Sequence, residues 1–337
     1  MEAVSIPVID LQKFPGQSAK ILEACKKWGC FRIINHGIPD KLMSDMKQVV
    51  RLLFDRPLEI KRRNTDVIEG SGYRAPNEKN PLYEALGLYD MGSSNAVETF
   101  CTQLDASPQQ RQVIKAYSTA SHELIMELCG MLAESMGLTN DLAKGWPCQF
   151  RINKYNFTQE SIGSSGVQIH TDSGFLTVLQ EDDCVGGLEV MNKSSGEYIA
   201  VDPLPRSLCV NLGDMATVWS NGAFCNVRHS VQCKQAAIRI SIALFLLGPK
   251  EAMVEAPQVF VDSNHPRLYK PFTYEDLRKL KISTGLHAGE ALELKDGPRK
   301  AKFPCKARAR SLGGVEFFFL ACGLGGLLGL KPPLAQL

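Results

Sequence analysis

The chain has no apolar run long enough to cross a bilayer. Its longest apolar stretch, Phe317 to Leu330, has 14 residues and is rich in glycine, whereas a membrane helix needs about twenty residues. The first residues, Met1 to Leu11, include Glu2 and Asp10 and contain no apolar segment, so no secretory signal is expected. We therefore expect a cytoplasmic protein that has no membrane partner.

Paired cysteines and a strong charge of one sign are also missing. The 11 cysteines are an odd number without any Cys-x-x-Cys spacing, which argues against a disulfide framework and against a thiolate zinc site. The net charge is only +2, and residues 295–310 hold seven basic residues against one acidic residue, so the remainder is mildly acidic. No nucleic-acid partner is expected, because basic and aromatic residues do not alternate.

The N-terminal part of the sequence predicts mainly helices. Apolar spacing and turn residues predict a strand over 6–10, a helix over 18–28, a buried strand over 30–34, a helix from Asp40 to Phe54 with Asp40 as its N-cap, loops over 64–106, and a long helix over 109–136. We group these residues as an N-terminal region, 1–106, and a long helix with its connection, 107–148.

From Gln149 onward the sequence pattern changes to short apolar segments separated by Gly, Pro, Asn and Asp. Strands are predicted at 149–156, 167–170, 174–180, 187–191, 198–202, 207–211, 215–219, 226–233 and 237–247, and a helix over 274–280. Many short strands indicate a β-sandwich or barrel rather than a parallel sheet. The expected divisions are a core over 149–250, its C-terminal extension over 251–294, and an atypical tail over 295–337.

Three residues form a candidate metal site. His170 and Asp172 are two residues apart in a predicted strand, so their side chains should point to the same face. The pair alone is a weak signal, but His229 follows at the start of another predicted strand. Two histidines and one carboxylate suit a non-haem iron(II) centre that leaves positions open for other ligands.

A second pair lies on the strand after His229. Arg239 and Ser241 also share one face of their predicted strand. If 2-oxoglutarate chelates the iron, its distal carboxylate needs a buried cation, and a guanidinium stays charged and can bind both carboxylate oxygens. Arg239 supplies that charge, and Ser241 can add a hydroxyl donor.

These motifs resemble the plant 2-oxoglutarate- and Fe(II)-dependent dioxygenases over residues 4–294. The ordered markers are Ile6-Pro-Val-Ile-Asp10, Trp28-Gly29 through Asn35-His36-Gly37, Asn153-x-Tyr155, His170-x-Asp172, Val210-Asn-Leu-Gly-Asp214, His229 and Arg239-x-Ser241. The resemblance implies a mainly β protein with flanking helices, in which a double-stranded β-helix, or jelly roll, surrounds the iron. It further implies that Tyr155 touches 2-oxoglutarate, that Asn153 and Asn211 support the site, and that O₂ is consumed and succinate and CO₂ are released, with ascorbate as reductant.

Three other stretches are similar to the auxin-oxidising subgroup of that family. They are Asn80-Pro-x-Tyr-Glu-Ala-Leu-Gly-Leu-Tyr-Asp90, Gly187-Leu-Glu-Val190 and Ser283-Thr-Gly-Leu-His-Ala-Gly-Glu-Ala291. This similarity implies oxidation of indole-3-acetic acid to 2-oxindole-3-acetic acid. Two departures stand out: Ser230 replaces the Arg that usually follows the second histidine, and residues 295–337 resemble no family ending.

The substrate itself is left open by the sequence. The same chemistry could act on an alkaloid, a flavonoid or a gibberellin, the same fold also serves oxidases that use no 2-oxoglutarate, and a binding protein could have kept the fold without turnover. Arg151 lies two and four residues before Asn153 and Tyr155 on one predicted strand. It is a candidate counter-charge for an acidic substrate, with a structural ion pair as the alternative. Phe175 is a second candidate substrate contact, and a monomer is expected.

Overall fold

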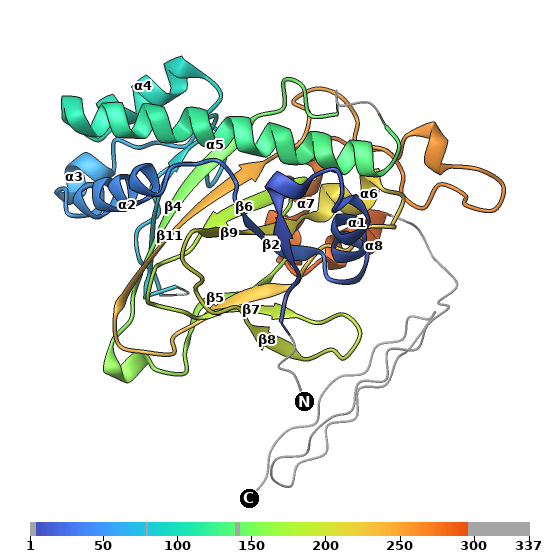
Figure 1. Cartoon of the computed structure of the whole chain (residues 1–337). Coiled ribbons are helices and arrows are strands. Elements are labelled where there is room, and N and C mark those ends of the chain that lie inside the picture. Colours follow the sequence, from blue (N-terminus) through green and yellow to red (C-terminus); the bar gives the residue numbers. More distant parts are fainter. Residues whose placement is uncertain (1–4, 79, 139–141, 296–337) are drawn as a thin grey trace, which may run out of the picture. The chain divides into compact units, whose positions relative to one another are not determined.

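The computed structural model describes residues 5–78, 80–138 and 142–295. Two β-sheets form its centre (Figure 1). The larger sheet has the order β1-β2-β9-β6-β11-β4-β3, with β1 Val8–Asp10, β2 Cys30–Ile34, β9 Ser207–Leu212, β6 Leu176–Gln180, β11 Ile238–Leu246, β4 Cys148–Asn156 and β3 Tyr83–Leu88. The smaller sheet has the order β5-β10-β7-β8, with β5 Ser165–His170, β10 His229–Gln232, β7 Leu188–Met191 and β8 Tyr198–Ala200.

Helices cover the face of the larger sheet that points away from the smaller one (Figure 1). The long helix α5, Pro108–Ser135, lies across that face, and its Tyr117 places its ring 5.9 Å from that of Phe150 on β4. Around α5 lie α1 Ser18–Lys27, α2 Asp40–Phe54, α3 Leu58–Lys61 and α4 Ser94–Gln103, and the later helices are α6 Asp214–Trp219, α7 Tyr274–Thr284 and α8 Glu290–Lys295.

The prediction of the long helix is confirmed, since α5 spans Pro108–Ser135. Its start follows from local chemistry, because the Ser107 hydroxyl accepts from the Gln110 amide while the Gln110 side chain accepts from the Ser107 amide. Pro108 occupies the first turn, where the missing amide hydrogen is no loss.

Alternation along β11 gives its two faces different partners. Ile240, Ile242 and Leu244 point into the core beneath the helices. Arg239, Ser241 and Ala243 point the other way and line a cavity between the two sheets. One face of β11 therefore contributes apolar side chains to the core, and the other face contributes Arg239 and Ser241 to the cavity.

Residues 64–106 were predicted as loops, and this is wrong for two segments. They contain β3, which pairs with β4 from Tyr83↔Tyr155 to Leu88↔Phe150, and α4. Gly87 lies inside β3, where the Cβ of any other residue would collide with the Ser71 carbonyl oxygen. The glycine thus allows a close backbone approach within the strand.

The strand predicted over 215–219 is also wrong, because this segment is helix α6. All six residues of α6 are buried, and a short apolar run has the same appearance in a buried strand and a buried helix. Asp40 is the first residue of α2 and makes no capping hydrogen bond, since Pro39 is the N-cap. The predicted tail over 295–337 lies, apart from Lys295, outside the described residues.

None of the helices in the described ranges is both long and apolar enough to span a membrane.

Candidate metal centre and cavity

The two candidate histidines face each other across neighbouring strands. His170 is the last residue of β5 and is the register partner of His229, the first residue of β10. Their ring centroids are 4.2 Å apart. Asp172 was expected in the same strand as His170, but β5 ends at His170 and Asp172 lies in the following loop. The expectation of one shared strand is therefore wrong.

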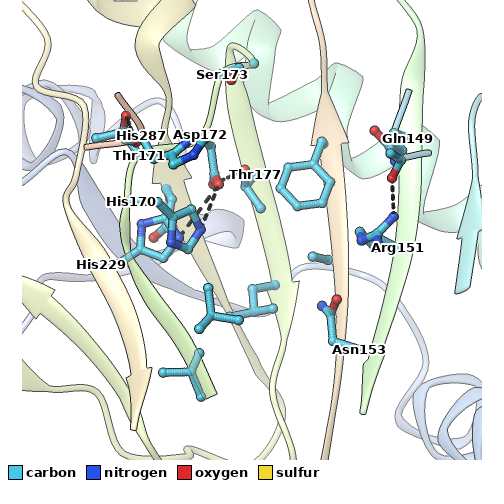
Figure 2. Close-up of a pocket in the computed structure, with 18 of the residues that line it drawn as sticks. Gln149, Arg151, Asn153, His170, Thr171, Asp172, Ser173, Thr177, His229 and His287 are labelled. Atoms are coloured by element: carbon cyan, nitrogen blue, oxygen red, sulfur yellow. Dashed lines mark hydrogen bonds and ion pairs between the residues drawn. The ribbon is translucent and has the colours of Figure 1, made fainter. Parts of the chain in front are cut away.

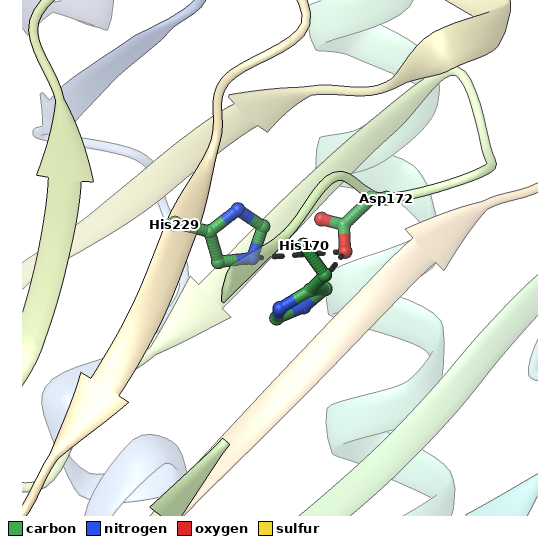
Figure 3. Close-up of side chains that lie close together, drawn as sticks. All are labelled: His170, Asp172 and His229. Carbon is green, nitrogen blue, oxygen red and sulfur yellow. Dashed lines mark ion pairs between the residues drawn. The ribbon is translucent and has the colours of Figure 1, made fainter. Parts of the chain in front are cut away.

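The loop nevertheless brings the carboxylate to both imidazoles (Figure 3). Asp172 Oδ1 lies 3.7 Å from His170 Nε2 and 3.7 Å from His229 Nε2. One ligand atom from each residue can be chosen so that all lie within 4.8 Å of one another. The second oxygen, Oδ2, accepts a 2.6 Å hydrogen bond from the Thr177 hydroxyl of β6. This bond fixes the rotation of the carboxylate and leaves Oδ1 facing the histidines.

Hydrogen bonds to the backbone set the tautomers of the two imidazoles. His170 Nδ1 lies 2.9 Å from the Gln168 carbonyl, and His229 Nδ1 lies 3.1 Å from the Val227 carbonyl. A carbonyl oxygen can only accept, so each Nδ1 carries the proton and each Nε2 keeps its lone pair for the space near Asp172.

Electrostatics keep this cluster in the protonation state that binds a cation. Burial, together with the neighbouring His229, lowers the pKa of His170 to about 4. Burial alone would raise the pKa of Asp172, but the two histidines and the Thr177 hydroxyl together hold it below its usual value. At neutral pH the cluster therefore offers a neutral His170 and an anionic carboxylate.

A polar wall lies across the cavity on β4 and β11 (Figure 2). Tyr155 is the register partner of Arg239, and Asn153 is the register partner of Ser241. The Asn153 amide donates to Ser241 Oγ at 3.4 Å, and its oxygen accepts from the Tyr83 hydroxyl at 2.7 Å. Burial raises the pKa of Tyr155 to about 12, so its hydroxyl stays protonated. Asn211 of β9 also lines the cavity.

Arg239 is buried without a carboxylate partner. Only 1% of the residue is exposed, and its Nε and Nη1 have no hydrogen-bond partner among the described residues. The guanidinium carbon lies 5.1 Å from the centre of the Tyr155 ring. A buried guanidinium with unsatisfied donors is costly, and it is the feature that a bound anion would relieve.

The two candidate substrate residues lie in different places. Arg151 lines the cavity, and its guanidinium donates to the Tyr83 hydroxyl at 3.1 Å and to the carbonyls of Gly70 and Gly72 at 2.7 and 3.4 Å. Phe175 is fully buried away from the cavity, and its ring packs 5.7 Å from Trp146 and 5.5 Å from Trp219.

The expectation that Phe175 contacts a substrate is therefore wrong. Phe175 precedes Thr177 and Leu179 by two and four residues, and both of these line the cavity. Simple alternation would therefore place Phe175 on the cavity side as well. However, β6 begins at Leu176, and the Phe175 amide is already bound to the Leu246 carbonyl at 2.7 Å. Strict alternation does not extend to a residue that precedes the strand.

Comparison with known proteins identifies the family. A family model described as the 2OG-Fe(II) oxygenase superfamily matches residues 146–248, and one described as the N-terminal part of a non-haem dioxygenase in morphine synthesis matches residues 6–99. A rice relative (Oryza sativa subsp. indica), named 2-oxoglutarate-dependent dioxygenase DAO, is 53% identical over 294 residues, which are 86% of this chain and 98% of the relative. The chain is a 2-oxoglutarate- and Fe(II)-dependent dioxygenase.

Solved structures of similar proteins have the same jelly-roll fold, which confirms the predicted fold class of this dioxygenase. The crystal structure of dioxygenase for auxin oxidation from rice gives a TM-score of 0.81 at 52% identity and covers 86% of this chain and 99% of that chain. Dioxygenase for auxin oxidation 1 from Arabidopsis thaliana, in a binary complex with 2-oxoglutarate, gives 0.77 at 58% identity and covers 78% and 100%.

The residues of this dioxygenase fit the two groups that its family uses. Two imidazole nitrogens and one carboxylate oxygen are suitable donors for Fe(II). The unpartnered guanidinium of Arg239 fits the distal carboxylate of 2-oxoglutarate. Both features come from the donor atoms of the cavity itself.

Sequence reasoning missed two residues that support the dioxygenase site. Thr177, which holds Asp172, faces the cavity by simple alternation along β6, so the period-2 pattern could have found it. Lys281 of α7 donates to the Thr171 carbonyl at 2.9 Å. Nothing near Lys281 in the sequence indicates this contact, because the two residues are 110 positions apart.

Proposed function

We propose that this dioxygenase oxidises indole-3-acetic acid at the indole ring to 2-oxindole-3-acetic acid. The proposal is supported by the relatives named for auxin oxidation, which are 52% to 58% identical to this chain. It is also supported by a cavity of about 680 Å³, a volume typical of sites for small organic ligands. Part of that cavity is apolar, with Val167, Leu179, Leu188, Val231 and Phe245 among its lining residues.

His170, Asp172 and His229 are assigned as the Fe(II) ligands, with Nε2, Oδ1 and Nε2 as the donor atoms. Arg239, Ser241 and Tyr155 are assigned to 2-oxoglutarate, and Asn153 orients the Ser241 hydroxyl. The observation that carries this assignment is the buried guanidinium of Arg239, whose Nε and Nη1 have no partner in the part of the chain that the structure describes. An ion pair with the distal carboxylate would neutralise the guanidinium and give hydrogen-bond acceptors to its donors.

Each residue has a defined task when the ligands are bound. Bound Fe(II) supplies the redox chemistry by which O₂ converts 2-oxoglutarate to succinate and CO₂ and oxidises the substrate. The backbone carbonyls of Gln168 and Val227 hold the two imidazoles in the binding tautomer. Thr177 fixes the carboxylate of Asp172. Arg239 orients 2-oxoglutarate, and the surrounding sheets exclude water from the reacting groups.

Arg151 is assigned to the carboxylate of the substrate. Its guanidinium donates to a tyrosine hydroxyl and to two backbone carbonyls, all of them neutral. Its charge therefore remains available for an anion, which favours a substrate contact over the alternative of a structural ion pair. Ascorbate is proposed as the reductant that keeps the iron ferrous, and the cytoplasmic, monomeric state stays a prediction.

The test is a turnover assay with the purified protein, Fe(II), ascorbate and 2-oxoglutarate. Indole-3-acetic acid should give succinate and 2-oxindole-3-acetic acid in equal amounts, and omission of 2-oxoglutarate should stop both. A panel of gibberellins and flavonoids serves as the comparison. Turnover with a panel member but not with indole-3-acetic acid would refute the substrate, whereas no turnover with any member would point to a binding protein.

A further inference from the structure

Lys281 connects helix α7 to residues 170–174, the end of β5 and the loop after it, which carry two of the assigned iron ligands and are called the ligand loop here. Its Nζ donates to Asp214 Oδ2 at 2.8 Å, to the Thr171 carbonyl at 2.9 Å and to the Thr171 hydroxyl at 3.3 Å. Thr171 is the residue between His170 and Asp172, and Figure 2 shows it directly beside them. Lys281 therefore reaches the centre of the ligand loop from another helix.

The ammonium group uses all three of its protons in these contacts. Lys281 is only 5% exposed, and Asp214 is fully buried. The second oxygen of Asp214 accepts from the Asn226 amide at 2.7 Å. A buried ion pair is tolerated when its remaining donors and acceptors are satisfied in this way. The Lys281–Asp214 pair is therefore a fully hydrogen-bonded ion pair of the protein interior.

Backbone hydrogen bonds extend the same support along the loop. The Asp214 amide donates to the Asp172 carbonyl at 2.8 Å, and the Met215 amide donates to the Gly174 carbonyl at 3.1 Å. On the other side, the Thr171 amide donates to the His287 carbonyl at 2.8 Å. The loop thus lies between α6 and the segment after α7, and Lys281 is the side chain that bonds to both the loop and α6.

We propose that Lys281 is a positioning residue for the metal centre: it holds the loop over 170–174 so that His170 and Asp172 stay aimed at one point. The proposal rests on the iron ligands assigned above. Without the ammonium, Asp214 would be a buried carboxylate with no cation, and the Thr171 carbonyl would lose this donor. The loop would then relax, and the two ligands would no longer be preorganised.

Lys281 also lines the cavity, so a direct contact with the substrate has to be separated from positioning. Its three protons are all engaged within the protein, which leaves none for a ligand. The distinguishing measurement is metal affinity without substrate and without 2-oxoglutarate, because a substrate contact cannot affect it.

The experiment compares Lys281→Met with Lys279→Met by calorimetric titration of the metal-free proteins with Mn(II). Lys279 is on the same helix, is largely exposed and lies 3.8 Å from Glu275, so its variant is the matched control. Loss of a group that orients metal ligands weakens metal binding by about 10- to 100-fold. Lys281→Met should show this loss, and Lys279→Met should bind Mn(II) as the unmodified protein does.

Two further measurements keep the outcome clear. Lys281→Gln retains an uncharged donor and should weaken Mn(II) binding less than Lys281→Met. In the unmodified protein, Mn(II) should slow hydrogen exchange both in the loop over 170–174 and in the last turn of α7, because coupling between them is reciprocal. This second measurement requires no folded variant.

The proposal is overturned if folded Lys281→Met binds Mn(II) as tightly as the control, or if Mn(II) slows exchange in the loop but not in α7. His170→Ala is the reference for the metal site itself. If His170→Ala also keeps full Mn(II) affinity, the assigned ligands are wrong; if it loses affinity and Lys281→Met does not, only the positioning role is wrong.

Discussion

Replacing Arg239 by Met should weaken the binding of 2-oxoglutarate to this dioxygenase without lowering the stability of the ligand-free protein. The variant removes the charge assigned to the distal carboxylate of 2-oxoglutarate. Loss of one partner from a buried, hydrogen-bonded charge pair costs about 2–5 kcal/mol. This corresponds to a dissociation constant for 2-oxoglutarate that is roughly 30-fold to 4,000-fold higher.

The same change should not destabilise the ligand-free protein. Arg239 is 1% exposed, and its Nε and Nη1 have no partner, so the folded state already carries the desolvation cost of this charge. Methionine is an adaptable apolar side chain that fills much of the same space. We therefore expect Arg239→Met to unfold at the same temperature as the unmodified protein or at a higher one, whereas most core substitutions lower it.

Thermal unfolding with Mn(II), with and without 2-oxoglutarate, measures both effects. At one hundred times its dissociation constant, 2-oxoglutarate should stabilise the unmodified protein by about 2.7 kcal/mol. At that concentration the variant should gain less than about 1 kcal/mol, because its affinity is at least roughly 30-fold weaker. Lys154→Met is the control: Lys154 neighbours Tyr155 on β4 and places its Nζ 5.7 Å from the Phe54 ring of α2, on the face under the helices.

Equal stabilisation of Arg239→Met and the control would show that the distal carboxylate is held elsewhere. A large fall in the unfolding temperature without ligand would instead show that the fold uses this charge.

Three further predictions concern the iron ligands, the substrate and the tail. Alanine in place of His170, Asp172 or His229 should abolish succinate formation while circular dichroism stays native, because the largest hydrophobic cluster lies under the helices and not at the cavity; full turnover by any one variant would refute the triad. Arg151→Leu should raise the Michaelis constant for indole-3-acetic acid and leave substrate-independent decarboxylation of 2-oxoglutarate largely intact; equal loss of both rates would indicate a structural role. Truncation after Lys295, which retains all of α8, should leave a folded, active enzyme in the succinate assay, because the family resemblance ends near this point; loss of folding would show that the removed residues stabilise the core.

Much of the fold could be predicted because its signals are local. The capping residues of α5 are adjacent in sequence to the helix they start, and the alternation on β11 puts Arg239 and Ser241 on one face without any knowledge of the partner strands. The errors occurred where local signals are ambiguous. Gly87 has the appearance of a breaker until the approach of Ser71 is known, and the apolar run of α6 has no period that distinguishes helix from strand.

The candidate site was predictable for a different reason. His170, Asp172, His229 and Arg239 belong to residue types that rarely combine in this order, so their identities carry the signal even though Asp172 lies outside its predicted strand. No comparable sequence motif identifies Lys281. Its role depends on Asp214 and Thr171, which are 67 and 110 residues away, and only the folded chain brings these groups together.

The buried cations of the described chain also show what kind of ligand the cavity can take. Arg32 pairs with Glu181 at 2.9 Å and Lys281 pairs with Asp214 at 2.8 Å, so the fold itself neutralises these charges. Arg239 differs, because its buried Nε and Nη1 have no partner. Arg151, which is half-buried, differs as well, since its three hydrogen bonds go to neutral oxygens. A low-dielectric cavity strengthens the attraction of such unneutralised charges for anions. Two cations on the same wall therefore support the proposal that the cosubstrate and the substrate each carry a carboxylate.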